Sequence, residues 1–278
     1  MKTVRLPTGE RVPALGQGTW NMGGRKRDRE QEIAALRLGL ELGLTLIDTA
    51  EMYGDGKSEE LIAEAIDGRR EQVFLVSKVL PQHATRRGTI KACEGSLSRL
   101  KTDSLDLYLL HWRGEVPLEE TLAGFDKLVA DGKIRHWGVS NFDVADMEEL
   151  VDLAGSSSVT TTNQVLYNLS RRGIEYHLLP WCRERQLPIM AYSPIEQGRL
   201  LKEAALKKVA ARHGATTSQV ALAWVLRHDD VIAIPKAAKS DHVRENHGAL
   251  GLLLSEQDLT DLDLAFPPPT SKVPLEVI

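Results

Sequence analysis

Short apolar runs alternate along this chain with longer segments in which apolar positions recur at helical spacing. An apolar run of about four to eight residues is typical of a buried strand, whereas the longer spacing is typical of a helix. The alternation predicts repeated strand and helix units around a parallel sheet. Eight segments fit the strand pattern: Leu15–Gly18, Thr45–Asp48, Val73–Lys78, Leu105–Leu110, Ile134–Val139, Thr161–Val165, Pro188–Tyr192 and Val231–Pro235.

Two of the segments between the strands show clear helical spacing. They are Arg29–Leu42 and Thr217–Arg227. Polar residues mark expected helix starts, because a hydroxyl can accept hydrogen bonds from the free amides of the first turn. We expect Ser58 to cap a helix whose first turn is acidic, and Thr216 or Thr217 to cap the later one.

Both ends of the chain carry additional elements. Val4–Leu6 and Arg11–Pro13 flank the turn sequence Pro7–Glu10, which predicts a hairpin at the bottom of the sheet. Ser255–Leu264 predicts an extra helix, and the prolines at Pro267–Pro269 prevent its continuation. The remaining tail is expected to lie across a surface.

The chain length agrees with this pattern. Its 278 residues lie close to the roughly 250 that are typical of a TIM barrel. We therefore predict an α/β fold, a (β/α)₈ TIM barrel with an N-terminal β-hairpin and an extra C-terminal helix and tail. Without repeats, linkers or composition shifts, residues 1–278 are expected to form a single domain.

Charge and cysteine content narrow the functional classes. The formal net charge is −4 and the charges are dispersed, which argues against nucleic acid as a partner. Cys93 and Cys182 are far apart and predict buried free thiols in a reducing compartment. Pro7 interrupts the N-terminus before a signal core could form, and no apolar run is long enough for a membrane helix. A cytoplasmic protein without membrane contact is expected.

Four residues with chemical potential follow predicted strands. Asp48, Tyr53, Lys78 and His111 all come at or after the carboxyl end of a strand, so a barrel would place them on one rim. Each has an ordinary structural explanation: a loop cap, a solvated strand end or a half-buried amphipathic side chain. The set as a whole favours an active site.

The sequence around these residues resembles the aldo-keto reductase family. The resemblance rests on Asp48–Gly54, Ser77–Lys78 and Leu107–Trp112, and it extends through Gly138–Phe142 to the end of the barrel. The short loop after His111 makes the chain most like bacterial methylglyoxal reductase-type members. This resemblance implies NADPH-dependent reduction of small aldehydes and α-dicarbonyls such as methylglyoxal.

The resemblance also assigns roles. Tyr53 would be the general acid that protonates the carbonyl oxygen, Lys78 the cation that favours phenolate, Asp48 the group that holds Lys78, and His111 the group that orients the carbonyl. An ammonium about 4 Å from the phenol would contribute roughly 4 kcal/mol at an effective dielectric near 20. We therefore expect Lys78 to outweigh moderate desolvation of Tyr53.

A dinucleotide site is not visible as a Rossmann fingerprint, because Gly16 and Gly18 lack the third glycine. The resemblance implies a different cofactor site along the barrel rim. Its cofactor residues would be Ser140, Asn141, Gln164, Tyr192, Ser193, Ile195, Gly198, Lys236, Ala237, His242, Glu245 and Asn246. Trp20 and Trp112 match positions that wall the substrate pocket, although ordinary packing is the alternative.

The chain departs from the family pattern near the expected 2′-phosphate. Ala237 and His242 stand where many members have Ser and Arg, so a hydroxyl and a permanent charge are lost. Lys236, Lys239 and Arg244 keep the region cationic. NADPH is the predicted cofactor, with NADH as the alternative.

Other functions remain open at this point. A nicotinamide-binding regulatory subunit of the same fold would bind the cofactor with little turnover, and a TIM barrel of unrelated chemistry would not need it. The eight histidines are scattered without metal-ligand spacing, so no metal is expected. The expected partner is a small-molecule carbonyl substrate, and the expected state is a monomer or weak oligomer.

Overall fold

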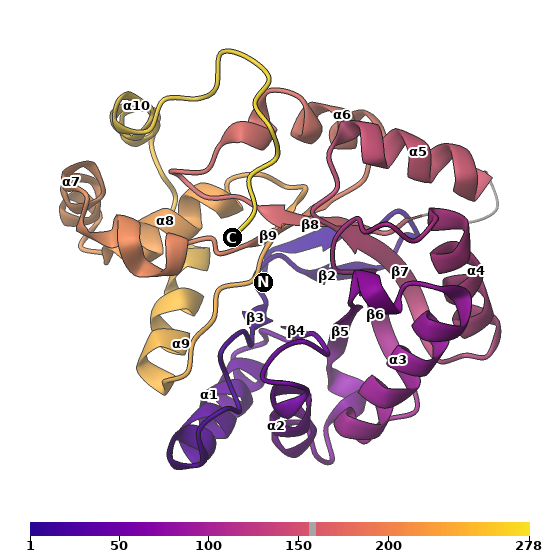
Figure 1. Cartoon of the computed structure of the whole chain (residues 1–278). Coiled ribbons are helices and arrows are strands. Elements are labelled where there is room, and N and C mark those ends of the chain that lie inside the picture. Colours follow the sequence, from indigo (N-terminus) through magenta and orange to yellow (C-terminus); the bar gives the residue numbers. More distant parts are fainter. Residues whose placement is uncertain (156–159) are drawn as a thin grey trace.

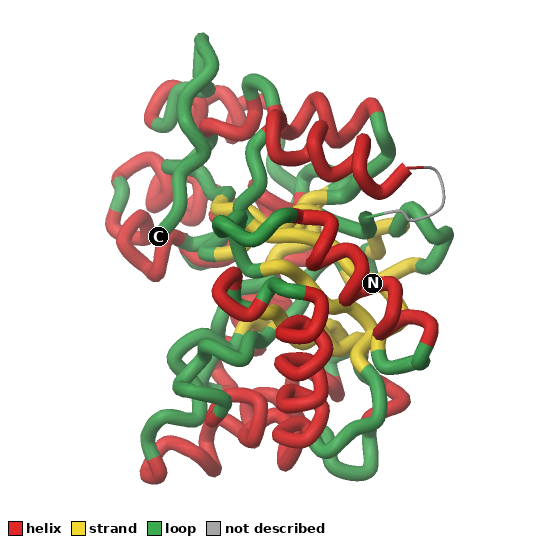
Figure 2. Tube along the Cα trace, turned by 45° about the vertical axis from the view of Figure 1, so that its right-hand side comes forward, coloured by secondary structure: helices red, strands yellow, loops and turns green. Residues whose placement is uncertain are grey.

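A computed structural model describes residues 1–155 and 160–278 of the chain. Eight parallel strands form one sheet in chain order, with the helices outside it (Figure 2). All eight predicted strands are present, with ends that shift by up to two residues. They are β3 (Gln17–Gly18), β4 (Leu46–Asp48), β5 (Phe74–Val79), β6 (Leu105–Leu110), β7 (Ile134–Ser140), β8 (Asn163–Leu166), β9 (Ile189–Tyr192) and β10 (Val231–Ala233).

The first and last strands of the sheet meet. Parallel bridges join Leu15 to Ala233 and Gly18 to Lys236. The Gly16 amide donates to the Ala233 carbonyl at 2.8 Å, and the Ala233 amide donates to the Ala14 carbonyl at 2.8 Å. These contacts close the sheet into the predicted barrel and leave no free edge.

One helix follows each strand around the barrel (Figure 1). These helices are α1 (Arg29–Glu41), α2 (Lys57–Ala65), α3 (Arg86–Leu100), α4 (Leu118–Ala130), α5 (Val144–Ala154), α6 (Leu178–Glu184), α8 (Thr217–Leu226) and α9 (Ser240–Gly248). Two further helices, α7 (Ala204–His213) and α10 (Glu256–Ala265), lie outside this ring. Short 3₁₀ helices are η1 (Lys26–Asp28), η2 (Arg70–Gln72), η3 (Pro81–His83), η5 (Gly173–Glu175), η6 (Glu196–Lys202) and η7 (Ala249–Gly251).

Helix α8 is buried almost all round instead of on the single face that its sequence spacing suggested. It packs against α7 on one side and α9 on another, so solvent does not reach either side. Its start matches the prediction, because Thr216 accepts a hydrogen bond from the Gln219 amide and the Gln219 side chain accepts one from the Thr216 amide.

The predicted cap at Ser58 is wrong. Helix α2 begins at Lys57, and the capping position is Gly56, whose φ of 85° suits glycine. Ser58 lies inside the helix and is fully buried, and its hydroxyl donates to the Thr19 hydroxyl at 2.9 Å. The Ser58 hydroxyl therefore bonds to a residue that is distant in the sequence, instead of capping the helix as its local sequence had predicted.

The predicted hairpin forms from β1 (Thr3–Arg5) and β2 (Arg11–Pro13). Glu10 in its turn contacts Arg135 and His136, which lie near the amino end of β7, so the hairpin covers the bottom of the barrel. The extra helix α10 also forms, with a capping box that starts at Ser255.

Both cysteines are buried free thiols, as predicted. Burial raises the pKa of each thiol to about 12, so both stay protonated and unreactive at neutral pH. Within residues 1–155 and 160–278, every helix is too short or too polar to span a bilayer. No group of three or more His, Cys, Asp or Glu side chains in those ranges could hold a metal ion.

The closing seam generates a stability prediction. A Cβ at Gly18 would lie 2.6 Å from the Ile234 carbonyl oxygen, which is backbone and cannot rotate away. We expect Gly18→Ala to destabilise the protein by about 1–3 kcal/mol, as overpacking does. Urea unfolding would measure this, with Gly24→Ala as the matched control, because a Cβ there meets nothing within 4 Å. Equal midpoints for the two variants would contradict the seam argument.

Candidate active site

The four residues singled out in the sequence meet at the carboxyl ends of the strands. Asp48 is the last residue of β4, Lys78 lies near the end of β5, and His111 directly follows β6. Tyr53 is in the loop between β4 and α2. Parallel pairing of β4, β5 and β6 brings these positions to one rim.

Lys78 is the centre of the group. Its side chain has no exposed surface, and its ammonium donates to Asp48 Oδ2 at 2.8 Å, to the Thr49 carbonyl at 2.7 Å and to the Tyr53 hydroxyl at 3.3 Å. Burial lowers the pKa of Lys78, but Asp48 and Tyr53 together raise it above its ordinary value. The lysine is therefore a buried cation at neutral pH, with all three donors used.

The pKa of Tyr53 differs from the sequence-based expectation. Burial raises it above its ordinary value of 10, Asp48 raises it further, and Lys78 only partly offsets both. The expectation that Lys78 would outweigh desolvation is wrong, because the site is more deeply buried than assumed and the Asp48 carboxylate opposes the lysine. The hydroxyl keeps its proton at neutral pH and can act as a donor.

His111 lies beside the tyrosine and is only 7% exposed. Its ring centre is 5.9 Å from that of Tyr53 and 4.9 Å from that of Trp112. Burial, reinforced by the Lys78 charge, lowers the pKa of His111 to about 3, so the ring is neutral at neutral pH. Its Nδ1 atom is buried and has no hydrogen-bond partner among residues 1–155 and 160–278.

Hydrogen bonds connect the lysine to the next strands of the barrel. The side-chain amide of Gln164 donates to Asp48 Oδ1 at 2.8 Å, and the Ser140 hydroxyl donates to the main-chain carbonyl of Gln164 at 2.8 Å. The Asn141 amide donates to Ser140 Oγ at 3.1 Å, and Tyr192 donates to Asn141 Oδ1 at 2.9 Å. One chain of polar groups thus runs from β9 to Asp48.

A cleft of about 910 Å³ opens over this rim. Asp48, Tyr53 and His111 line it, while Lys78 lies behind them. The two tryptophans predicted for the substrate pocket, Trp20 and Trp112, line it as well. So do all the predicted cofactor residues except one: Ser140, Asn141, Gln164, Tyr192, Ser193, Ile195, Gly198, Lys236, His242, Glu245 and Asn246.

The exception is Ala237, which packs partly buried against the core and does not line the cleft. Other residues that were not predicted also line the cleft, among them Met52, Arg113, Val277 and Ile278. The tail was expected to cross a surface, but its end reaches the cleft. The sequence does contain a signal that the end of the tail is partly buried, because apolar residues recur between positions 273 and 278, after the prolines.

Comparison with known proteins agrees with this geometry. The model of the aldo/keto reductase family matches residues 14–265, which is most of the chain. The chain belongs to the aldo/keto reductase family. The family resemblance and the barrel predicted from the sequence are both confirmed.

Individual members of the family are similar over nine-tenths or more of their length. The methylglyoxal reductase YeaE of Escherichia coli is 54% identical, with 100% of this chain and 99% of that protein covered. The glyoxal reductase of Bacillus subtilis is 35% identical over 94% of this chain and 91% of its own. A solved aldo-keto reductase from Klebsiella pneumoniae in complex with NADPH has a TM-score of 0.95 and 51% identity, covering 100% of this chain and 99% of that chain.

The buried histidine generates a prediction about pH. The pKa of His111 in the folded state, about 3, lies below the unfolded value of about 6.5, so unfolded chains bind the proton first as the pH falls. Its stabilising contribution is complete above about pH 6.5 and decreases toward pH 3. We expect this one residue to cost roughly 2 kcal/mol by pH 5.

Urea unfolding at pH 7.5 and pH 5 would measure this loss in the natural protein and in His111→Gln. The variant should lose less stability between the two pH values, and the difference isolates His111 from all other titrating groups. An identical loss in both proteins would show that the histidine is not held neutral.

Proposed function

We propose that this protein reduces small aldehydes and α-dicarbonyls, such as methylglyoxal, to alcohols with NADPH, and that Asp48, Tyr53, Lys78 and His111 carry out the reaction. The observation that carries the proposal is the 3.3 Å contact between a buried ammonium and a protonated phenol at the edge of a large cleft. A cation fixed at that distance favours the phenolate that remains after proton donation.

The reaction divides the work among the residues. NADPH, when bound, would supply a hydride to the carbonyl carbon. Negative charge develops on the carbonyl oxygen, and the Tyr53 hydroxyl donates its proton there. Lys78 stabilises the resulting phenolate, and Asp48 keeps Lys78 charged and aimed. Neutral His111 orients the carbonyl oxygen through a hydrogen bond.

The residues of the cleft fit the parts of this cofactor. Ser140, Asn141 and Gln164 supply the hydroxyl and amide groups that a carboxamide needs, and the Tyr192 ring offers a flat face for the nicotinamide. Backbone at Ser193, Ile195 and Gly198 is suited to the pyrophosphate. The exposed ammonium of Lys236 and the ring of His242 are suited to the 2′-phosphate, and Glu245 and Asn246 to the adenine.

Similar proteins support the substrate and the cofactor. The Escherichia coli and Bacillus subtilis relatives are named for the reduction of methylglyoxal and glyoxal, and the Klebsiella pneumoniae structure contains NADPH. Two buried free thiols also support a reducing, cytoplasmic location. Trp20 and Trp112 would wall the substrate side of the cleft.

The role of Tyr53 is tested by Tyr53→Phe, which removes only the hydroxyl. We expect kcat for methylglyoxal to fall by roughly 10²- to 10⁴-fold, since general acid catalysis contributes about that much. NADPH binding, followed by cofactor fluorescence, should be unchanged. Tyr176→Phe is the matched control, because Tyr176 is 49% exposed and does not line the cleft. Full turnover of the Tyr53 variant would exclude the proposed acid, and absence of turnover in the natural protein would favour a regulatory subunit.

The cofactor preference is tested by Lys236→Gln. Loss of a charged hydrogen bond to the 2′-phosphate should weaken NADPH binding by about 1.5–3 kcal/mol, or roughly 10- to 100-fold, while NADH binding changes little. Fluorescence titration with both cofactors gives the ratio directly. Lys207→Gln on the outer face of α7 is the control, as this lysine is exposed and outside the cleft. Equal weakening for both cofactors would place the lysine elsewhere than at the phosphate.

A further inference from the structure

The C-terminal tail returns from α10 to the cleft. Figure 1 shows it as the yellow segment that ends beside β9, and Val277 and Ile278 line the cleft itself. Burial raises the pKa of Tyr192 to about 12, and a hydrogen bond with the Ile278 backbone partly offsets this. The end of the tail therefore touches the aromatic side chain that is proposed to face the nicotinamide.

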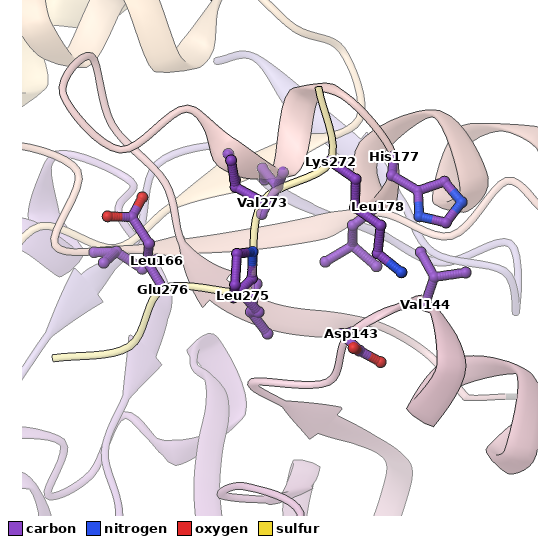
Figure 3. Close-up of a pocket in the computed structure, with 12 residues that line it drawn as sticks. Asp143, Val144, Leu166, His177, Leu178, Lys272, Val273, Leu275 and Glu276 are labelled. Atoms are coloured by element: carbon purple, nitrogen blue, oxygen red, sulfur yellow. The ribbon is translucent and has the colours of Figure 1, made fainter. Parts of the chain in front are cut away.

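Between α10 and the cleft, the tail packs against the body of the protein through Val273 and Leu275. A cavity of about 50 Å³ separates it from the body of the protein between β8, α5 and α6 (Figure 3). Val273 rests on Gly173, where a Cβ would lie 2.7 Å from the valine methyl group. Among the described residues after Phe266, the ion pair between Glu276 and Arg171 is the one side-chain ion pair that anchors the tail.

Arg171 joins this tail to a second segment. Its Nη1 atom donates to Glu276 Oε1 at 2.6 Å, and its Nε atom donates to Glu196 Oε1 at 3.3 Å. Glu196 belongs to η6 and lies among the residues proposed to contact the pyrophosphate, between Ile195 and Gly198. A guanidinium stays charged and presents several donors in a fixed plane, so one side chain can hold both carboxylates.

Glu196 controls the shape of the loop around it. Ser193, Glu196 and Gln197 have φ values of 47°, 49° and 54°, a region that residues other than glycine rarely adopt. Such strain persists only where surrounding contacts enforce it. Glu196 is 4% exposed, and its carboxylate accepts from Asn168 Nδ2 at 2.8 Å and from Arg199 Nη2 at 2.8 Å, besides Arg171.

We propose that Arg171 is a positioning residue that couples the tail over the substrate mouth to the 193–198 loop of the cofactor site. When Glu276 engages Arg171, the guanidinium is fixed against Glu196 and the strained loop is held in shape. When the tail detaches, Arg171 becomes mobile and Glu196 retains only Asn168 and Arg199. Tail closure and cofactor retention are then cooperative, and this inference rests on the proposed function.

The test is a double-mutant cycle on NADPH release, which needs no turnover. Glu276→Gln in the full chain should raise the NADPH dissociation rate by roughly two- to fivefold, as measured by stopped-flow cofactor fluorescence, because losing one half-exposed ion pair costs up to about 1 kcal/mol. Arg171→Gln should show a similar rate, and Glu276→Gln should add nothing in its presence. Lys272→Gln is the matched control, because this exposed tail residue is not ion-paired in the described structure.

Removal of residues 272–278 provides a second test of the same coupling. It should raise the rate at least as much as Glu276→Gln does, because it also removes the contact between Ile278 and Tyr192, and it should raise the rate by a smaller factor in Arg171→Gln than in the natural protein. The proposal is overturned if Glu276→Gln releases NADPH at the rate of Lys272→Gln, or if the two substitutions are additive. In either case a natural protein that still reduces methylglyoxal keeps the proposed function, whereas failure to bind NADPH at all refutes both.

Discussion

An ammonium buried inside the barrel rim is the constraint on which this site depends. Lys78 has no contact with solvent, and a buried charge is costly unless it is paired and all its donors are used. Asp48, Thr49 and Tyr53 together meet that demand, and Asp48 is in turn held by Gln164 from the opposite part of the barrel. The buried charge of Lys78 is therefore satisfied only if the strands that carry its partners stay in register. The same contacts place the Tyr53 phenol beside the Lys78 ammonium.

Barrel closure makes this arrangement rigid. Asp48, Lys78, His111 and Gln164 come from different strands, and only a closed parallel sheet keeps their carboxyl ends around one opening. The hairpin covers the other end, so the strands are fixed at the bottom while the loops at the top differ in length and shape. The bottom of the barrel therefore serves stability, and the opposite end, at the carboxyl ends of the strands, carries the active site.

The loops above the rim follow a different principle. The segment around Glu196 holds unfavourable backbone angles, and it does so because a buried carboxylate receives hydrogen bonds from several directions. The tail reaches the same region with few anchors of its own. A rigid rim beneath loop and tail segments suits a protein that must hold a cofactor and admit a small carbonyl compound.

The sequence by itself determined the barrel, the order of its strands and the rim position of Asp48, Tyr53, Lys78 and His111, because strand spacing is local and parallel strands end on the same side. The family's motifs then indicated most residues of the cleft. Only the tertiary structure decided that Ser58 bonds to Thr19 instead of capping a helix, that burial dominates the pKa of Tyr53, and that the tail enters the cleft. Each of these depends on partners or on burial supplied by distant parts of the chain, which no local pattern encodes.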